Sequence, residues 1–166
     1  MVQSGDTDLS APGPNGGNSI AVIAWHLSGN LASCFTDFLT SDGEKPWRQP
    51  EEEFAASAVT RDGLLEKLER GWTVLLSTLA ALSDIHLQQA VTIRGRSLQA
   101  HNALHRSLTH TSYHVGQIVC VARAIRGETW RSLNIPPWGS AAYNENPAFD
   151  RPSEHSAGLK PDLDKK

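Results

Sequence analysis

The chain has 166 residues, of which 39% are apolar and 20% charged, and this length is enough for one domain with a sizeable core. Its 18 acidic and 15 basic residues give a net charge of −3, which provides no electrostatic reason to expect nucleic acid as a partner. No apolar run is long enough to span a membrane, the N-terminus lacks the order of a signal peptide, and the two isolated cysteines predict reduced thiols in a cytoplasmic protein.

The first predicted helix follows a polar N-terminal segment. Residues 1–17 are rich in Ser, Gly, Pro and Asp and contain almost nothing to bury, so we expect this segment to be disordered. Asn18 or Ser19 can then cap a helix that runs to about residue 39. Its apolar residues recur on one face at helical spacing, which predicts a core face made of Ile20, Ile23, Leu27, Leu31, Cys34, Phe35 and Phe38.

A line of polar side chains runs along one flank of this apolar face. Its members are spaced four, three and four residues apart: His26, Asn30, Ser33 and Asp37. Such a line marks either the solvated rim of a helical bundle or the wall of a cavity. The irregular, charged residues 40–58 follow, and we expect Trp47 to pack onto the bundle so that this loop forms a lid or a pocket wall.

A second long helix is predicted over residues 60–82, with Thr60 as its N-cap. Its broad apolar stripe consists of Leu65, Leu68, Trp72, Leu75, Leu76, Leu79 and Leu82. Residues 90–98 place β-branched side chains before Gly95, and this pattern predicts a small hairpin that turns at the glycine.

A third long helix is predicted over residues 99–126, and Gly127 ends it. Its apolar stripe consists of Leu104, Leu108, Val115, Ile118, Val119, Ala122 and Ile125. From about residue 148 to residue 166 the chain is polar, and we expect it to be disordered. Residues 18–147 are therefore expected to form one all-α domain, a helix bundle with a small β-hairpin.

Two pairs of histidines lie four residues apart on the third helix, so the members of each pair project from the same side of it. Either pair, His101 with His105 or His110 with His114, can bind one first-row metal ion. The pairs flank the apolar stripe on opposite sides, and helical angle alone does not choose between them. The position of His110 and His114 in the middle of the helix, where neighbouring helices can reach them, favours this pair.

A third ligand must come from elsewhere in the chain, and the leading candidate is His26 on the first helix. Spacing alone also allows the alternative that all these histidines are surface or half-buried residues without a metal. Three neutral imidazoles on one ion leave a position for water or substrate, which is the arrangement of catalytic rather than closed structural sites.

The residues around His26, and the stretch that begins His110-Thr-Ser-Tyr-His114-Val-Gly-Gln, together resemble the DinB/YfiT-like superfamily of metal-binding four-helix proteins. In that superfamily one histidine on an early helix and an H-x-x-x-H-x-G-Q motif on a later helix hold a divalent metal ion. The resemblance therefore implies a DinB-like up-and-down helix bundle with a metal site made of His26, His110 and His114.

Residues 36–48 and 131–136 look like an uncharacterised branch of that superfamily, and the resemblance covers residues 18–147. Its members normally have a further helix before the one with the first histidine, and residues 1–17 are too short and too polar to supply it. Either the chain starts late, or the bundle has three main helices and an exposed apolar flank. A partner subunit can cover such a flank, and because superfamily members are often dimers we expect a homodimer.

The resemblance also implies thiol chemistry, because several members are similar to transferases that use a low-molecular-weight thiol such as bacillithiol or mycothiol. We therefore expect a divalent ion, zinc or nickel, to support the joining of such a thiol to an electrophilic small-molecule substrate. Two alternatives stay open. One is a hydrolase that uses metal-bound water, and the other is a non-enzymatic, stress-associated bundle that captures metal or a small ligand.

Further candidates surround the three predicted ligands. An amide three residues after His114 can orient an imidazole or bind a ligand, and polar or aromatic side chains near His26 can line a pocket. For each of them the structural alternative is ordinary helix packing or a solvated surface. The residues that can orient an imidazole, bind a ligand or line a pocket in this way are Gln117, Asn30, Asp37, Trp25 and Trp47.

Overall fold

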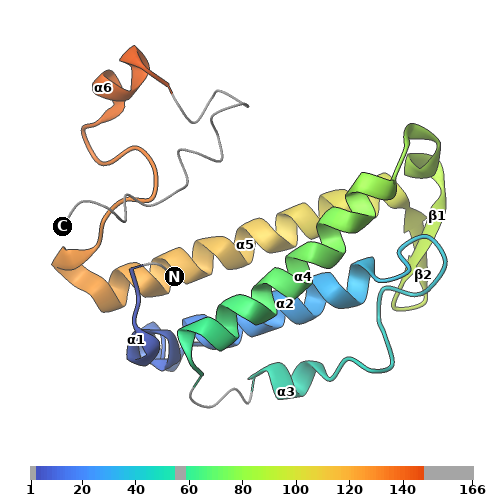
Figure 1. Cartoon of the computed structure of the whole chain (residues 1–166), viewed down its shortest axis with the longest axis horizontal. Coiled ribbons are helices and arrows are strands. Elements are labelled where there is room, and N and C mark those ends of the chain that lie inside the picture. Colours follow the sequence, from blue (N-terminus) through green and yellow to red (C-terminus); the bar gives the residue numbers. More distant parts are fainter. Residues whose placement is uncertain (1–2, 55–58, 148–166) are drawn as a thin grey trace. The chain divides into compact units, whose positions relative to one another are not determined.

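The computed structural model describes residues 3–54 and 59–147, and this part of the chain is mostly helical (Figure 1). Three long helices, α2 (Ile20–Phe35), α4 (Arg61–Ala81) and α5 (Ala100–Arg126), are accompanied by an antiparallel hairpin of β1 (Ala90–Ile93) and β2 (Arg96–Gln99). The predicted all-α bundle with a small hairpin is confirmed. The other elements are short: α1 (Asp6–Ser10), η1 (Pro14–Gly16), α3 (Pro50–Phe54), η2 (Asp84–Gln88), η3 (Gly127–Thr129) and α6 (Ser140–Glu145).

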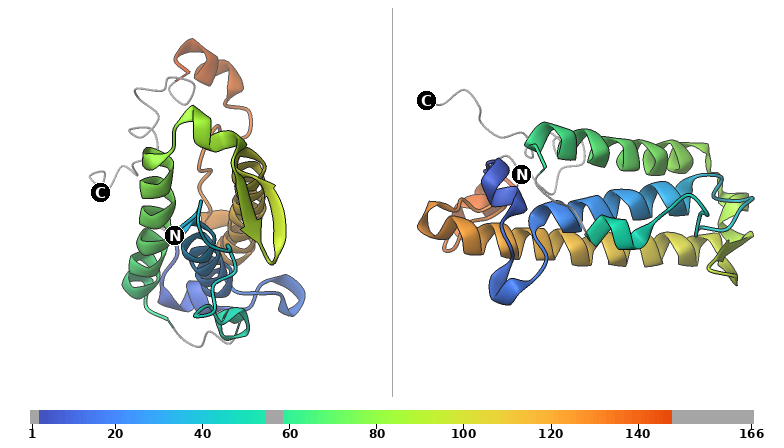
Figure 2. Two further views of the ribbon diagram at one scale, coloured as in Figure 1. Left: turned by 90° about the vertical axis from the view of Figure 1, so that its right-hand side faces the viewer. Right: turned by 90° about the horizontal axis from the view of Figure 1, so that it is seen from below.

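Helix α2 lies between α4 and α5 and packs against both (Figure 2). The Thr78 hydroxyl near the end of α4 donates to the Phe35 carbonyl at the end of α2 (2.9 Å), and Ser28 donates to the Lys67 carbonyl nearer the beginning of both helices. Helices α2 and α4 therefore run in the same direction, and α5 runs in the opposite one (Figure 1). This order differs from the expected up-and-down arrangement, because the connection that contains α3 returns along α2 before α4 begins.

The beginnings of α2 and α4 are set by the hydroxyls that the sequence suggests. Ser19 and Thr60 each accept a hydrogen bond from the backbone N–H three residues further on, which satisfies one free donor of the first helical turn. Helix α2 ends at Phe35, earlier than expected, because Asp37 has a φ of 48°, and a right-handed helix cannot continue through that conformation. The predicted core face is nevertheless buried at every position, from Ile20 to Phe38.

The core is centred on α2. Gly71 of α4 comes so near to α2 that a Cβ atom there would lie 2.9 Å from the Ser28 carbonyl oxygen, so this crossing requires glycine. On the other side, residues of the hairpin and of α5 join α2 in one hydrophobic cluster, whose buried members are Leu27, Leu31, Cys34, Phe35, Phe38, Val91, Ala100 and Ala103.

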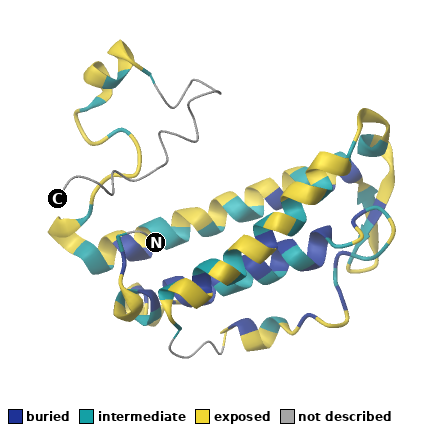
Figure 3. Ribbon diagram, viewed as in Figure 1, coloured by how far each residue is buried: buried dark blue, intermediate teal, exposed yellow. Residues whose placement is uncertain are grey.

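Parts of the predicted apolar stripes of α4 and α5 face solvent (Figure 3). In α4, Leu76 and Leu79 are 58% and 41% exposed, and in α5, Leu108 and Val115 are 66% and 44% exposed. The apolar stripes of these two helices are therefore only partly buried. Each of these helices packs against α2 over one side, so within the described residues part of each apolar face remains uncovered.

Two segments differ from what the sequence predicts. In residues 3–17, where we expected disorder, α1 packs against α2 and α5, and the side chain of Leu9 is fully buried. Leu9 fills a place in the core, and the backbone N–H of Arg61 donates to the Asp6 carboxylate (2.8 Å), so apolar and polar contacts both tie this segment to the bundle. Trp47, which we expected to pack onto the bundle, is 57% exposed.

The described residues fall into two compact units, one of residues 3–126 and one that begins at Gly127 and contains η3 and α6. Membership of residues 127–147 in the predicted domain, residues 18–147, stays a prediction, and the predicted disordered tail of residues 148–166 lies outside the described residues. Among the helices described, none is both long enough and apolar enough to cross a membrane. The cytoplasmic location stays a prediction.

Candidate metal centre

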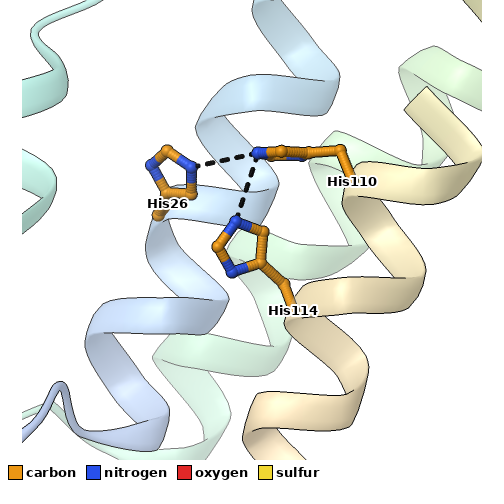
Figure 4. Close-up of side chains that lie close together, drawn as sticks. All are labelled: His26, His110 and His114. Carbon is orange, nitrogen blue, oxygen red and sulfur yellow. Dashed lines mark hydrogen bonds between the residues drawn. The ribbon is translucent and has the colours of Figure 1, made fainter. Parts of the chain in front are cut away.

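Three imidazoles from two helices meet between α2 and α5 (Figure 4). His110 and His114 lie one turn apart on α5, and His26 faces them from α2. The Nε2 atom of His110 lies 3.4 Å from Nε2 of His26 and 3.1 Å from Nε2 of His114. One ring nitrogen of each residue lies within 4.8 Å of the others, so the three histidines lie close enough to bind a metal ion.

The outer nitrogens of two of these rings have acceptor partners. His26 Nδ1 lies 3.0 Å from Oε2 of Glu53, and His114 Nδ1 lies 2.8 Å from Oε1 of Gln117. The Glu53 carboxylate can only accept, so it favours the tautomer of His26 with its proton on Nδ1, and the Gln117 amide oxygen favours the same tautomer of His114; in that tautomer the Nε2 lone pair points into the cluster. These partners leave the inner nitrogens of His26 and His114 as bases or ligands.

The donor set fits a metal ion. Two nitrogen ligands placed tetrahedrally about 2.0–2.1 Å from a zinc ion are about 3.3–3.4 Å apart, close to the distances from His110 Nε2 to the Nε2 atoms of His26 and His114. A single N–H on His110 Nε2 can serve only one of its two neighbours, while His110 Nδ1 is buried without a hydrogen-bond partner among the described residues. The three inner Nε2 atoms therefore hold more lone pairs than protons, and a cation can accept all three of these lone pairs at once.

Burial keeps the two α5 histidines neutral. It lowers the pKa of His110 to about 4, and the neighbouring His114 and His26 add to this effect. Burial also lowers the pKa of His114, although the hydrogen bond to Gln117 opposes the shift. Both rings are therefore unprotonated at pH 7, the state in which an imidazole can bind a metal.

A buried ion pair contacts His26 at Nδ1, the ring nitrogen that does not face His110. Arg48 donates to both carboxylate oxygens of Glu53, from Nε to Oε1 (3.0 Å) and from Nη2 to Oε2 (2.9 Å), and Oε2 also accepts from His26. Burial alone would raise the pKa of Glu53, but the hydrogen bonds from His26 and Arg48 lower it below its ordinary value. Glu53 is therefore a carboxylate at neutral pH.

Sequence reasoning missed Glu53 and Arg48. Both lie in the segment expected to be an irregular charged loop, and Glu53 is the last of three consecutive acids with nothing in its type or spacing to distinguish it. The folding of residues 50–54 into α3 places Phe54 beside the site as well, with its ring centroid 5.4 Å from that of His26.

The two predicted tryptophans line the same pocket, of about 470 Å³, beside Glu53. Trp25 comes from α2 and Trp47 from the connection before α3. The ammonium group of Lys67, on α4, also borders this pocket and lies 3.8 Å from the centroid of the Trp25 ring. Glu53 lines the pocket and contacts His26, so it connects the pocket to the histidine cluster.

The other predicted residues have different positions. Gln117 contacts His114 directly and donates to the Tyr113 hydroxyl (3.1 Å), so Tyr113, which is not among the predicted residues, is tied to the site as well. Asn30 is buried on α2, one turn beyond His26. Asp37 lies beyond the end of α2 and lines a pocket with Phe38, which is a different pocket from the one lined by Trp25 and Trp47. The break of α2 at Phe35 ends the line of polar residues before it reaches Asp37.

The rival histidine pair has no third partner among the described residues. His101 and His105 have ring centroids 6.1 Å apart, and His101 Nδ1 donates to the Leu87 carbonyl (3.0 Å). His105 is exposed. This pair lies at the hairpin end of α5, where no further histidine, cysteine or acidic side chain of the described chain completes a cluster with it.

Comparison with known proteins identifies a family. Residues 1–139 match the model of a family described as "Protein of unknown function (DUF1572)". Neither the curated proteins nor the solved structures contain a match. The matched region includes all three histidines of the cluster, but the family description assigns no activity to them.

Proposed function

The chain belongs to the DUF1572 family, and we propose that it is a divalent-metal-binding, DinB-like protein whose His26, His110 and His114 hold a zinc or nickel ion. The observation that carries this proposal is the convergence of three Nε2 atoms from helices α2 and α5. The contacts of Glu53 with His26 and of Gln117 with His114 support it, because they favour Nδ1–H tautomers, whose Nε2 lone pairs are directed into the cluster.

We propose further that the protein is an enzyme that joins a low-molecular-weight thiol to an electrophilic small molecule. When bound, an ion held by three imidazoles supplies a Lewis acid with an open position, where it lowers the pKa of a water or thiol. In the reaction a carbon–sulfur bond forms, the bond from that carbon to its leaving group breaks, and the thiol proton passes to solvent. The choice of a thiol rests on the resemblance to the DinB/YfiT-like superfamily.

The chain's own residues have separable tasks in this proposal. His110 and His114 bind the ion without first losing a proton, since both are neutral at pH 7. Glu53 and Gln117 hold two of the rings in place. The pocket beside Glu53 has the aromatic faces of Trp25 and Trp47 to accept an apolar substrate and the Lys67 ammonium to attract an anionic group.

The uncovered apolar side chains of α4 and α5 support the homodimer that the resemblance implies. Four aliphatic side chains on these two helices are at least 41% exposed: Leu76, Leu79, Leu108 and Val115. A second copy of the chain could bury them, and light scattering on the purified protein at several concentrations measures whether it does.

Two measurements on purified protein test the function. The first is elemental analysis, with one zinc or nickel per chain expected and its loss in the His114→Ala variant. The second is the consumption of an electrophile such as monobromobimane in the presence of a panel of bacterial thiols. A metal-dependent rate that the His114→Ala variant lacks supports the transferase.

Other outcomes favour the alternatives. Ester hydrolysis that needs the metal but no thiol favours a hydrolase. Tight metal binding without turnover of any thiol or ester favours a protein that only captures metal or a small ligand. Absence of metal binding would contradict the proposed site altogether.

A further inference from the structure

We propose that Glu53, clamped by Arg48, is the positioning residue that fixes the orientation and tautomer of His26 for metal binding. This inference rests on the proposed metal site and extends it to the segment between α2 and α4. Glu53 does not reach the centre of the cluster itself. It contacts the far nitrogen of the ring whose near nitrogen faces His110.

The carboxylate is held in one place. Its two oxygens take both N–H donors of a bidentate arginine, and the side chains of Arg48 and Glu53 are 2% and 7% exposed. Oε2 therefore has a fixed position from which to accept the Nδ1–H of His26. A carboxylate on a mobile, solvated side chain would not determine which nitrogen of His26 carries the proton.

The contact of Glu53 with His26 affects His26 as a metal ligand in two ways. A carboxylate cannot donate, so it excludes the tautomer of His26 with its proton on Nε2, the nitrogen that faces His110 and His114. Its negative charge also makes the ring a stronger base at Nε2, because it stabilises the partial positive charge that the ring acquires when it binds a cation. Carboxylate–histidine–metal chains act in this manner in metal sites generally.

Helix α2 leaves space for the Glu53 carboxylate at Gly29, which has no Cβ atom. At Gly29 a Cβ atom would lie 2.1 Å from Oε1 of Glu53, and a Cβ–oxygen contact that short does not occur. Glycine in the middle of a helix costs stability relative to alanine, so its presence here needs a reason, and the close approach of Glu53 supplies one. The glycine thus allows the acidic side chain of α3 to reach His26, which precedes Gly29 by nearly one helical turn.

The alternative is that the Arg48–Glu53 pair only fastens α3 to α2. The two explanations differ in what they predict for the tautomer of His26 and for metal affinity. A fastening pair stabilises the fold but leaves the intrinsic affinity of the folded site unchanged. A positioning residue changes both the tautomer and the affinity, even in a variant that remains fully folded.

The test uses the full chain and two variants, Glu53→Gln and Gly29→Ala. The zinc affinity is measured by competition with a chelator, and the His26 tautomer of the metal-free protein is read from the ¹⁵N shifts of its ring in two-dimensional NMR. In wild type we expect the proton on Nδ1. Glu53→Gln, whose amide can donate as well as accept, should lose the single tautomer and bind zinc about 10–100-fold more weakly.

Gly29→Ala keeps the acid and its charge but displaces it, and it raises the helix propensity of α2. We expect it to weaken zinc binding in the same range although the fold is retained. Glu51→Gln is the matched control, since it removes the same charge from an exposed position of α3 and should leave affinity and tautomer unchanged.

Each outcome has a defined meaning. Wild-type affinity and a single Nδ1–H tautomer in the folded Glu53→Gln variant would overturn the positioning role and leave the metal site standing. A proton on Nε2 of His26 in metal-free wild type would also overturn it. If wild type binds neither zinc nor nickel, the proposed function fails, while the tautomer measurement still decides what Glu53 does to His26.

Discussion

The Nε2 atoms of His26 and His110 lie 3.4 Å apart, although 84 residues separate the two histidines in the chain. Neutral imidazoles do not attract each other strongly, so the folding of α2 against α5 places them together rather than any affinity between the rings. A site held in this way by the scaffold keeps its shape without the ion.

Removal of one ligand should abolish tight metal binding without unfolding the protein. Loss of a residue that hydrogen-bonds a metal ligand typically lowers metal affinity by roughly 10–100-fold. We expect His110→Ala to lower it by more, because this variant lacks one of the metal ligands themselves. Helix content, measured by circular dichroism, should remain near the wild-type value, since the core centred on α2 does not include this ring. Collapse of the helical signal would instead identify a structural metal.

The neighbouring histidine pair provides the matched control. His105→Ala removes an exposed imidazole from the same helix, and we expect its metal content per chain to equal that of wild type. Elemental analysis of the two alanine variants side by side measures this. A loss of metal in His105→Ala would mean that the pair at the hairpin end of α5 is the real site.

The metal-free protein should lose stability in acid through His110. The unfolded chain takes up a proton on this ring near its ordinary pKa of about 6.5, whereas the folded protein does so only near a pKa of about 4. The free energy of unfolding therefore has its full contribution from His110 above pH 6.5. This contribution is lost as the pH falls to about 4, which lowers the free energy of unfolding by about 1–2 kcal/mol once partial exposure of the ring is allowed for.

Urea titrations at several pH values, in the presence of a chelator, measure this slope. His110→Gln should show a smaller decrease between pH 6.5 and pH 4 than wild type, and His105→Gln should match wild type. Equal slopes in the His110 variant and wild type would show that burial of His110 does not contribute to acid sensitivity.

The crossing of α2 and α4 should depend on Gly71. Gly71→Ala places a Cβ atom 2.9 Å from the Ser28 carbonyl oxygen, and we expect it to destabilise the protein by about 1–3 kcal/mol despite the better helix propensity of alanine. Gly116→Ala on α5 is the contrast, because a Cβ atom there meets no atom within 4 Å and should raise stability by about 0.5–1 kcal/mol. Thermal unfolding of the two variants should show shifts of opposite sign.

Trp47 should contribute to substrate binding rather than to the stability of the fold. Its side chain is 57% exposed but lines the pocket beside Glu53, so Trp47→Ala should change the melting temperature little and raise the KM of a thiol-transfer reaction several-fold. Trp138→Ala, which removes a fully exposed tryptophan outside the pocket, is the control. Equal KM values for both variants and wild type would remove this pocket from the proposed substrate site.

Several features followed from the sequence because they depend on neighbours along the chain. Helical spacing identified the buried face of α2, and it placed His110 and His114 on one side of α5. Ser19 and Thr60 were recognisable as caps, because a cap acts on an N–H only three residues away. The hairpin turn at Gly95, with a φ of 70°, was recognisable for the same local reason.

Other features depended on contacts between distant segments. The break of α2 at Phe35, the shared direction of α2 and α4 and the exposure of Leu76 and Leu108 could not be read from periodicity, which shows that a face is apolar but not what covers it. Spacing supplied a pair of histidines, but only the packing of α2 on α5 brought His26 to them. The role of Glu53 could not be predicted from the sequence, because it depends on the contact of this carboxylate with the His26 ring. No local pattern in the chain specifies that contact.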